Sequence, residues 1–292
     1  MTTMEEILQH LGDSTTILKK TEVNGGDINE AFHVQTERQA YFVKQNQNVP
    51  SHFFQVEARG LELIRDTGTV HVPEVYYYDT GSGSGDSYLV MEHIKKEAST
   101  PLLQQRLGER LARMHRTTGG GYGFHQATFV GELDQINEMV PSWVEYYRTY
   151  RLLPQFHLAE KNGRLPAGRR QRLSRLIERL DSFLPNDPGS SLLHGDLWGG
   201  NWIPGPDETP YLIDPSVLYG DRLMDLSFTE LFGGYSGRFY DSYKQEAPLP
   251  DYYEEVKPLY QLFYLLVHLN LFGEAYGSPV DRILSHYIDT KG

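Results

Sequence analysis

The chain has 292 residues, carries 27 Lys and Arg against 39 Asp and Glu, and contains no cysteine. The lack of cysteine excludes disulfide bonds, cysteine-ligated metal centres and thiol nucleophiles, and therefore any disulfide-linked partner. The formal charge of −12 argues against broad binding to nucleic acid or anionic lipid, which requires many Lys and Arg side chains to neutralise phosphates. The length predicts one large domain or two lobes.

The first third of the chain predicts a small antiparallel sheet with two helices. Apolar residues at helical spacing predict helices over Met4–Leu11 and Phe53–Asp66. Short β-prone runs separated by turn residues predict strands over Ile17–Val23, Ala31–Thr36, Tyr41–Gln45, Val75–Tyr78 and Tyr88–Val90. The last two runs flank a Gly- and Ser-rich turn over residues 79–87, which we expect to be a mobile hairpin tip.

The remainder of the chain predicts mainly helices. The helical patterns cover Leu102–His115, Pro141–Leu153, Arg169–Leu184 and Leu259–Phe272. A sheet followed by a helix-rich segment is typical of an α+β protein. We therefore expect two lobes, a small antiparallel-sheet N-lobe over residues 1–93 and a larger, mostly helical C-lobe over residues 94–292.

Two segments bear on location and on charged partners. The most apolar stretch, Leu259–Phe272, is interrupted by polar residues and is too short to span a bilayer, so it predicts a buried helix. The N-terminus lacks the basic start and apolar run of a secretion signal, which favours a cytoplasmic protein without membrane contact. The basic segment over residues 161–179 is either a solvated helix face or a phosphate-binding patch, and the missing aromatic residues favour the solvated face.

The residues that indicate chemistry lie between Leu192 and Asp214. His194, Asp196 and Asn201 have the spacing H-x-D-x-x-x-x-N, and an apolar strand ending at Asp214 follows. This is the pattern of a phosphotransferase catalytic loop with a metal-binding Asp on the next strand. Phosphoryl transfer to a hydroxyl needs a carboxylate that accepts the proton, a role that fits Asp196. Asn201 and Asp214 supply the oxygen ligands that Mg²⁺ prefers.

The N-lobe supplies the other parts that a kinase needs. Lys44 ends the strand Phe42-Val43-Lys44, and Glu57 follows in the next helix, the order of the ion pair that orients a phosphate-binding lysine. Each residue alone would be an ordinary surface charge, and only the joint pattern favours a nucleotide site. Gly25 and Gly26 lie where a loop would cover the phosphates, although the sequence there is not G-x-G-x-x-G.

A strand at the lobe boundary runs into a polar connector. The residues Met91, Glu92, His93 and Ile94 occupy the position at which a two-lobed kinase offers backbone groups to adenine. Together with the catalytic loop, these residues predict ATP and Mg²⁺ as the cofactors and a nucleotide-binding N-lobe above a catalytic, substrate-binding C-lobe.

The stretch LLHGDLWGGNW resembles the signature of the fructosamine kinase (ketosamine-3-kinase) family, whose kinase-like fold is shared with aminoglycoside and choline kinases. Other segments that resemble the family, in family order, are GGDINEAF, YFVK, EARGLELI, LVMEHI, LGERLARMH and ELFGG. The resemblance implies that Asp196 is the catalytic base, that Asn201 and Asp214 bind magnesium, and that Trp198 supports the sugar of the substrate. Trp198 could instead pack in the core beneath the catalytic loop.

The resemblance also implies an activity. It is the ATP-dependent phosphorylation of the 3-hydroxyl of ketosamines, the ribulosamine or fructosamine adducts of lysine or other amines, on small molecules or on glycated peptides and proteins. Phosphate at that carbon makes the adduct prone to lose the amine, which implies a deglycating role. Some relatives carry a cysteine in the glycine-rich loop, and this chain does not.

Two further residues and two other functions remain open. We expect His194 to hold the catalytic loop by hydrogen bonds rather than to carry protons, and Asp225 to support that loop from the C-lobe. The same chemistry on an aminoglycoside, a choline-like amino alcohol or a free sugar is the alternative activity. A nucleotide-binding scaffold without transfer is a third hypothesis, weakened because the base, the lysine and both metal ligands are present.

Overall fold

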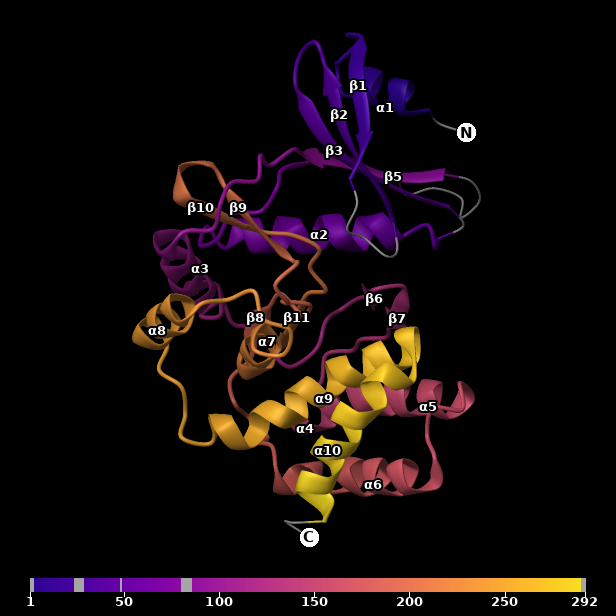
Figure 1. The fold of residues 1–292 in the computed structure, drawn as a ribbon, viewed down its shortest axis with the longest axis vertical. Helices are drawn as coiled ribbons and strands as arrows, with labels where there is room; N and C mark the ends of the chain where they lie inside the picture. Colours follow the sequence, from indigo (N-terminus) through magenta and orange to yellow (C-terminus); the bar gives the residue numbers. More distant parts are fainter. Residues whose placement is uncertain (1–2, 24–28, 48, 80–85, 290–292) are drawn as a thin grey trace.

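The computed structural model describes residues 3–23, 29–47, 49–79 and 86–289, which form the two expected lobes (Figure 1). The N-lobe is a five-stranded antiparallel sheet with strand order β1-β2-β3-β5-β4. Its strands are β1 (Ile17–Glu22), β2 (Glu30–Thr36), β3 (Ala40–Gln47), β4 (Val75–Tyr78) and β5 (Asp86–Glu92), and its helices are α1 (Met4–His10) and α2 (Phe53–Asp66). All seven elements agree with the predicted ranges to within a few residues, whereas the expected hairpin tip and the glycines at 25 and 26 lie outside the described residues.

The two faces of the N-lobe sheet have different partners. Tyr41 and Val43 pack with α1 on one face, because alternate side chains of a strand point to opposite sides. On the other face Phe42 packs with Leu89, Met91 and residues of α2 in the main core. Lys44, two residues after Phe42, therefore lies on the face that α2 covers.

The C-lobe is built around the long buried helix α9 (Figure 1). Its other helices are α3 (Pro101–Met114), α4 (Trp143–Tyr146), α5 (Leu153–Lys161), α6 (Ala167–Glu178), α7 (Leu223–Thr229), α8 (Gly237–Glu246), α9 itself (Tyr253–Phe272) and α10 (Gly277–Ile288). Three short antiparallel pairs complete it: β6 (Thr128–Val130) with β7 (Leu133–Gln135), β8 (Ser191–Leu193) with β11 (Leu218–Gly220), and β9 (Trp202–Gly205) with β10 (Thr209–Leu212).

Three predicted helices have different limits in the structure. The one expected over Arg169–Leu184 is α6, which ends at Glu178, followed by a 3-10 turn over Leu180–Ser182. The pattern over Pro141–Leu153 is one short helix, α4, followed by a π-helical turn over Tyr147–Leu152 that leads into α5. Pro154 in the first turn of α5 explains the change, because proline cannot donate the regular backbone hydrogen bond and its ring clashes with the preceding turn. Helix α9 begins at Tyr253, six residues before the predicted start at Leu259, and continues through Pro258. The prediction began after this proline because proline is usually found only in the first turn of a helix.

The lobes are joined by backbone contacts besides the connector. The amide of Leu212 in β10 donates to the carbonyl oxygen of His71 in the N-lobe at 2.9 Å. Within the C-lobe, the amide of Glu97, just after the connector, donates to the carbonyl oxygen of Pro204 in β9 at 2.7 Å. The β9–β10 hairpin is thereby attached to both lobes. The division at residues 93 and 94 stays a prediction.

Three arginines of the basic segment, Arg169, Arg170 and Arg172, are paired with acidic side chains. Arg169 is buried, with 4% of its surface exposed, and bonds Glu274 at 2.7 Å and Asp281 at 2.8 Å. It therefore ties α6 to α10 and is not part of a solvated face, whereas Arg170 and Arg172 form exposed ion pairs. That the chain binds no nucleic acid stays a prediction. Within the described chain, every helix falls short of the length or apolarity needed to cross a bilayer.

Candidate active site

The catalytic loop follows β8 and turns sharply at Gly195. This glycine has φ of 82°, and a Cβ atom on it would lie 1.9 Å from the carbonyl oxygen of Ser216. Only glycine fits, because a side chain would be strained by the backbone conformation and blocked by the neighbouring strand connection.

His194 is fully buried and holds the loop, as predicted. Its Nε2 lies 2.8 Å from the carbonyl oxygen of Ile213, and its Nδ1 accepts from the amide of Asp196 at 3.3 Å. A carbonyl accepts only from N–H, so this pattern defines a neutral imidazole protonated at Nε2. Burial lowers the pKa of His194, which favours the same neutral form. The side chain links the catalytic loop to the residue just before Asp214.

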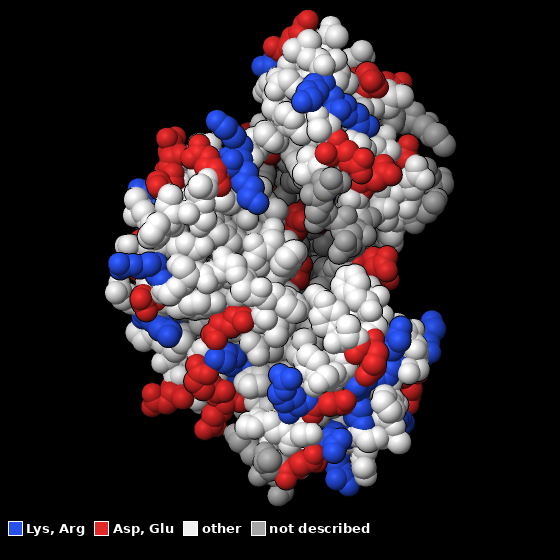
Figure 2. Space-filling view, viewed as in Figure 1, with Lys and Arg blue, Asp and Glu red and all other residues white. Residues whose placement is uncertain are grey.

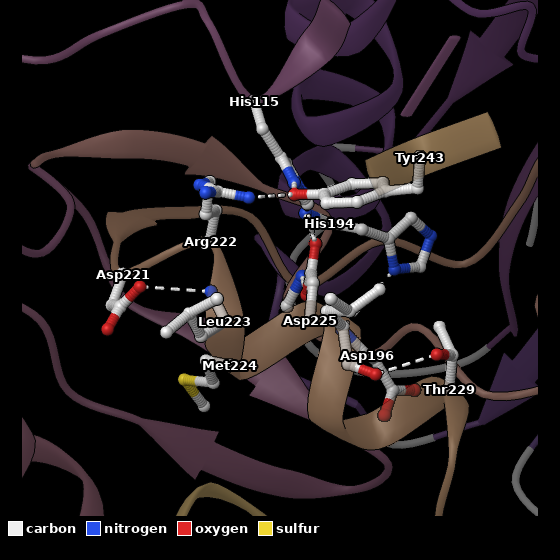
Figure 3. Close-up of polar contacts among 12 residues, drawn as sticks. His115, His194, Asp196, Asp221, Arg222, Leu223, Met224, Asp225, Thr229 and Tyr243 are labelled. Atoms are coloured by element: carbon white, nitrogen blue, oxygen red, sulfur yellow. Dashed lines mark hydrogen bonds and ion pairs between the residues drawn. The ribbon is translucent and has the colours of Figure 1, made fainter. Parts of the chain in front are cut away.

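Asp225, the second residue predicted to support the loop, lies at the centre of a buried network (Figure 3). Its carboxylate, on α7, accepts from the amides of His194 at 2.6 Å and Gly195 at 2.9 Å. His115 lies 3.2 Å from the same carboxylate through Nε2 and 2.8 Å from the hydroxyl of Tyr243 through Nδ1. Helices α3, α7 and α8 are therefore joined behind the loop, and hydrogen bonds hold its backbone in place.

Asp196 lies in the cleft beside Asn201. The Nδ2 of Asn201 donates to the carbonyl oxygen of Asp196 at 2.8 Å and to its Oδ2 at 2.9 Å. Burial, together with the nearby charge of Asp214, raises the pKa of Asp196 to about 7. A carboxylate with a pKa near neutrality is suited to accept a proton during a reaction.

Lys44, Glu57 and Asp214 form an ion cluster across the two lobes. The Nζ of Lys44 lies 2.7 Å from Oε1 of Glu57 and 2.7 Å from Oδ1 of Asp214. Burial alone would lower the pKa of Lys44, but the two carboxylates outweigh it and raise that pKa above its usual value. The lysine is therefore charged and aimed at the cleft. The backbone of Asp214 has a positive φ of 56°, and its side chain is 39% exposed, so this carboxylate is in contact with solvent.

The connector residues are partly committed to the N-lobe. The amide of Glu92 donates to the carbonyl oxygen of Glu74 at 2.8 Å, so it is not available to a base. Met91 packs in the main core, and His93 lies against His33 of β2 with ring centroids 4.1 Å apart. Burial and the neighbouring His33 lower the pKa of His93. The backbone groups of His93 and Ile94, beyond Glu92, are the part of the connector that is left to bind a ligand.

Trp198 lies on the surface of the catalytic loop and not in the core. Its side chain is among the exposed aromatic residues, with 40% of its surface accessible. The indole covers Gly200, where a Cβ atom would lie 2.2 Å from the ring. Gly200 therefore makes room for the indole, which presents a broad apolar face next to Asp196 along the chain.

The donor set of the cleft fits magnesium. Within the described residues, no group of three or more His, Asp or Glu side chains is arranged to hold a metal. Asn201 uses its Nδ2 toward Asp196, which leaves Oδ1 as an oxygen ligand, and Asp214 keeps a carboxylate oxygen beside Lys44. Mg²⁺ that is bound with a nucleotide usually has a few protein oxygens as ligands, and phosphate oxygens and water complete its coordination.

These groups lie in a hollow between the lobes, where acidic side chains are visible at the floor (Figure 2). The structure brings Lys44 and Glu57 from the N-lobe to Asp214, and Asn201 to Asp196. Gly25 and Gly26, the predicted phosphate-covering glycines, lie outside the described residues. Charges are concentrated where a polyanionic nucleotide and its metal would lie.

Comparison with known proteins places the chain in a family. The profile of the fructosamine kinase family matches residues 1–290. The chain belongs to the fructosamine kinase family. A probable ketoamine kinase of Enterococcus faecium is 37% identical over 94% of this chain and 100% of its own length. A chloroplastic protein-ribulosamine 3-kinase of Arabidopsis thaliana is 35% identical over 95% of this chain and 85% of its own.

Solved structures agree with this assignment. A candidate fructosamine-3-kinase from Thermobifida fusca has a TM-score of 0.88 at 27% identity, covering 99% of both chains. Choline kinase LicA from Streptococcus pneumoniae has a TM-score of 0.66 at 18% identity over 97% of this chain and 98% of its own, which shows a shared fold. The predicted family resemblance and the two-lobed kinase-like α+β fold are confirmed. As a member of the family, the chain is an ATP-dependent phosphotransferase.

Three supporting side chains were not anticipated from the sequence. His115 and Tyr243 complete the network around Asp225, and Tyr264 of α9 donates from its hydroxyl to the carbonyl oxygen of Gly195 at 3.0 Å. A signal for His115 existed, because it continues the buried row formed by Leu107 and Leu111 at i, i+4 spacing on α3. Tyr243 and Tyr264 had no such signal among the 20 tyrosines of the chain.

Proposed function

We propose that this protein transfers the γ-phosphoryl group of ATP to the 3-hydroxyl of a ketosamine, the adduct of a ketose with a primary amine. The observation that carries the proposal is a half-buried Asp196 held beside Asn201, together with the ion cluster of Lys44, Glu57 and Asp214, whose charges act on Asp196. The names of the curated relatives, ketoamine kinase and protein-ribulosamine 3-kinase, favour this acceptor over an aminoglycoside or a choline-like amino alcohol.

In the proposed reaction Asp196 accepts the proton of the 3-hydroxyl as the new bond between that oxygen and the γ-phosphorus forms. The bond from the γ-phosphorus to the β-phosphate oxygen breaks at the same time, and ADP leaves. The Nδ2 of Asn201 donates to Oδ2 of Asp196, so Oδ1 is the oxygen that accepts from the 3-hydroxyl. A pKa near 7 allows Asp196 to be ionised before the reaction and to hold the proton afterwards.

The remaining residues bind and orient the two substrates. Lys44, kept charged by its two carboxylate partners, orients the nucleotide phosphates, and the connector beyond Glu92 holds the base. Asn201 and Asp214 would hold Mg²⁺, which when bound neutralises phosphate charge. Trp198 offers its indole to the apolar face of the sugar. A cytoplasmic location and action on glycated protein remain part of the proposal.

The test is transfer of phosphate to synthetic ketosamines. Purified protein is incubated with ATP, Mg²⁺ and the ribulosamine or fructosamine of N-α-acetyl-lysine, and the product is examined by ³¹P and ¹³C NMR. We expect a monophosphate at carbon 3, with ribulosyl and fructosyl adducts compared for rate. Free ribose, an aminoglycoside and choline serve as control acceptors. Phosphorylation of one of these controls in preference to both ketosamines would contradict the proposal.

A further inference from the structure

Exposed aromatic side chains gather beside the catalytic loop. Among the described residues, the exposed large aromatic side chains are Trp198, Phe232, Tyr252 and Phe272. Trp198 is on the catalytic loop, and Phe232 and Phe272 both lie against the ring of His268. Exposed aromatic residues that cluster rather than scatter usually mark a binding surface.

Phe232 and Phe272 belong to a cup of four rings centred on His268. The ring centroid of His268 lies 4.8 Å from that of Phe232, 5.5 Å from that of Phe272 and 4.9 Å from that of Tyr276. Phe232 and Phe272 are 43% and 52% exposed. We call these four residues the aromatic cup. Its members come from the loop after α7, from the end of α9 and from the turn after it, so only the fold assembles them.

Two contacts attach the cup to the catalytic loop. Phe232 is followed by Gly233 and Gly234, which touch Gly199 so closely that a Cβ atom on Gly199 would lie 2.5 Å from the carbonyl oxygen of Gly233. One helical turn before His268, Tyr264 bonds the carbonyl oxygen of Gly195. The end of α9 thus rises toward the space between the lobes (Figure 1), and much of the lower rim of the hollow is uncharged (Figure 2).

The centre of the cup presents one hydrogen-bond acceptor. The Nδ1 of His268 lies 2.8 Å from the carbonyl oxygen of Tyr264 and must donate to it, so the neutral ring leaves Nε2 as an acceptor. Burial lowers the pKa of His268, which favours the neutral form. Nε2 makes no hydrogen bond to the described part of the chain, and it is not among the fully buried polar atoms. The nearest acid along the chain, Glu274, is bound to Arg169.

We propose that the aromatic cup binds the amine-bearing arm of the ketosamine, with the protonated secondary amine donating to Nε2 of His268 and its alkyl chain lying on Phe272 and Tyr276. Ring faces attract an ammonium group, and apolar walls accept its methylenes. This inference rests on the proposed function, because it names the part of the same substrate that extends from the phosphorylated sugar.

The experiment compares two ribulosamines that differ only in the arm, the adducts of methylamine and of N-α-acetyl-lysine. Wild-type protein should show the higher kcat/KM with the longer arm. Phe272→Ala should reduce the ratio of the two kcat/KM values about 10-fold, the range that one apolar pocket contact supplies. Tyr252→Ala, an exposed aromatic residue outside the cup, should leave that ratio unchanged.

A second pair of variants tests the acceptor. His268→Leu should raise KM for both ribulosamines, and His268→Gln, which places a carbonyl oxygen near the position of Nε2, should restore part of the loss. An unchanged arm preference in Phe272→Ala, or no preference in the wild type, would overturn the inference while leaving the kinase proposal intact. Absence of phosphorylation of both ribulosamines by the wild type would instead overturn the proposed function and this inference with it.

Discussion

The two sides of the cleft hold their charged groups in different ways. On the N-lobe side, Lys44 is held by Glu57 and by Asp214, a carboxylate of the other lobe that is partly open to solvent. On the C-lobe side, the carboxylate of Asp225 is fully buried and bonded to two backbone amides and a histidine. The first cluster crosses between lobes, whereas the second lies within one.

This difference matches what each side has to do. Under the proposed function, Asp214 would give up its contact with Lys44 and would hold Mg²⁺ when a nucleotide enters, so its cluster must be able to rearrange. The loop that carries Asp196 has to keep one geometry through the reaction, because a catalytic base works only within hydrogen-bond distance of the proton it accepts. Fully satisfied buried hydrogen bonds provide that rigidity. Four substitutions or titrations can test the contrast.

The largest effect is expected from Asp196→Asn. The amide cannot accept the hydroxyl proton, so the rate of transfer should fall by about 10² to 10⁴-fold, the usual contribution of a general base. Initial rates measured with saturating ATP and ketosamine check this, with Asp251→Asn on an exposed turn as the control. Affinity for ATP, measured by calorimetry, should change little. Near-normal turnover would show that Asp196 is not the base.

Lys44→Met should reduce activity by about 100-fold, similar to the loss of one oriented donor in other active sites. The loss should be seen with ATP as the varied substrate, since Lys44 is placed to orient phosphate and not the acceptor. Lys19→Met, on the exposed strand β1, is the matched control. If the two variants lose activity equally, the cross-lobe cluster has no specific role.

Asp225→Asn should cost stability as well as rate. The substituted amide has one oxygen for two backbone N–H groups, and leaving a buried donor unsatisfied costs about 1–3 kcal/mol. We expect a lower urea midpoint and a lower kcat with an unchanged KM for ATP, because the effect passes through the loop geometry. Asp181→Asn, an exposed acid in the same lobe, should alter neither. A change in KM alone would place Asp225 in nucleotide binding instead.

The smallest effect is a pH dependence of stability caused by Asp196. Its pKa of about 7 in the folded protein exceeds the usual value of 3.8, so between these values the folded chain holds a proton that the unfolded chain has lost. The free energy of unfolding therefore falls as pH rises through this interval, by at most about 1.4 kcal/mol per pH unit. Activity should rise over the upper part of the same interval as Asp196 ionises.

Urea unfolding at pH 5 and pH 7.5 checks the slope in the wild type and in Asp196→Asn. Burial also raises the pKa of Asp221, to about 6, but Asp221 is present in both proteins, so their difference isolates Asp196. The variant should lose less stability between the two pH values. Equal slopes would mean that Asp196 is ionised throughout.

Much of the site could be predicted because its residues belong to short local patterns. The spacing of His194, Asp196 and Asn201 lies within one loop, and Lys44 precedes its helix partner Glu57 by a fixed strand-to-helix connection. The buried partners of the loop could not be found in this way. Tyr243 and Tyr264 come from helices distant in sequence, and nothing local distinguishes them from the other tyrosines.

The limits of the secondary-structure predictions have local causes. The strands and helices of the N-lobe agree with the sequence because alternation and helical spacing are strong there. The helix expected over Pro141–Leu153 is interrupted by a π-helical turn because Pro154 changes the hydrogen bonding of the turn before it. The chain nevertheless stays helical across Pro154, and this depends on packing. Arg169, expected on a solvated face, is buried because Glu274, in the turn before α10, and Asp281 of α10 supply two carboxylates.

By itself the sequence determined the order of elements and the family, and it predicted the residues that would do the chemistry, because periodicity and motif spacing are local properties of the chain. Only the tertiary structure decided that Lys44 bonds Asp214 across the cleft and that Asp225 holds the catalytic loop from behind. It alone also placed Phe232, His268, Phe272 and Tyr276 around one point. These contacts depend on how the lobes and helices pack, and packing is set by the whole chain at once.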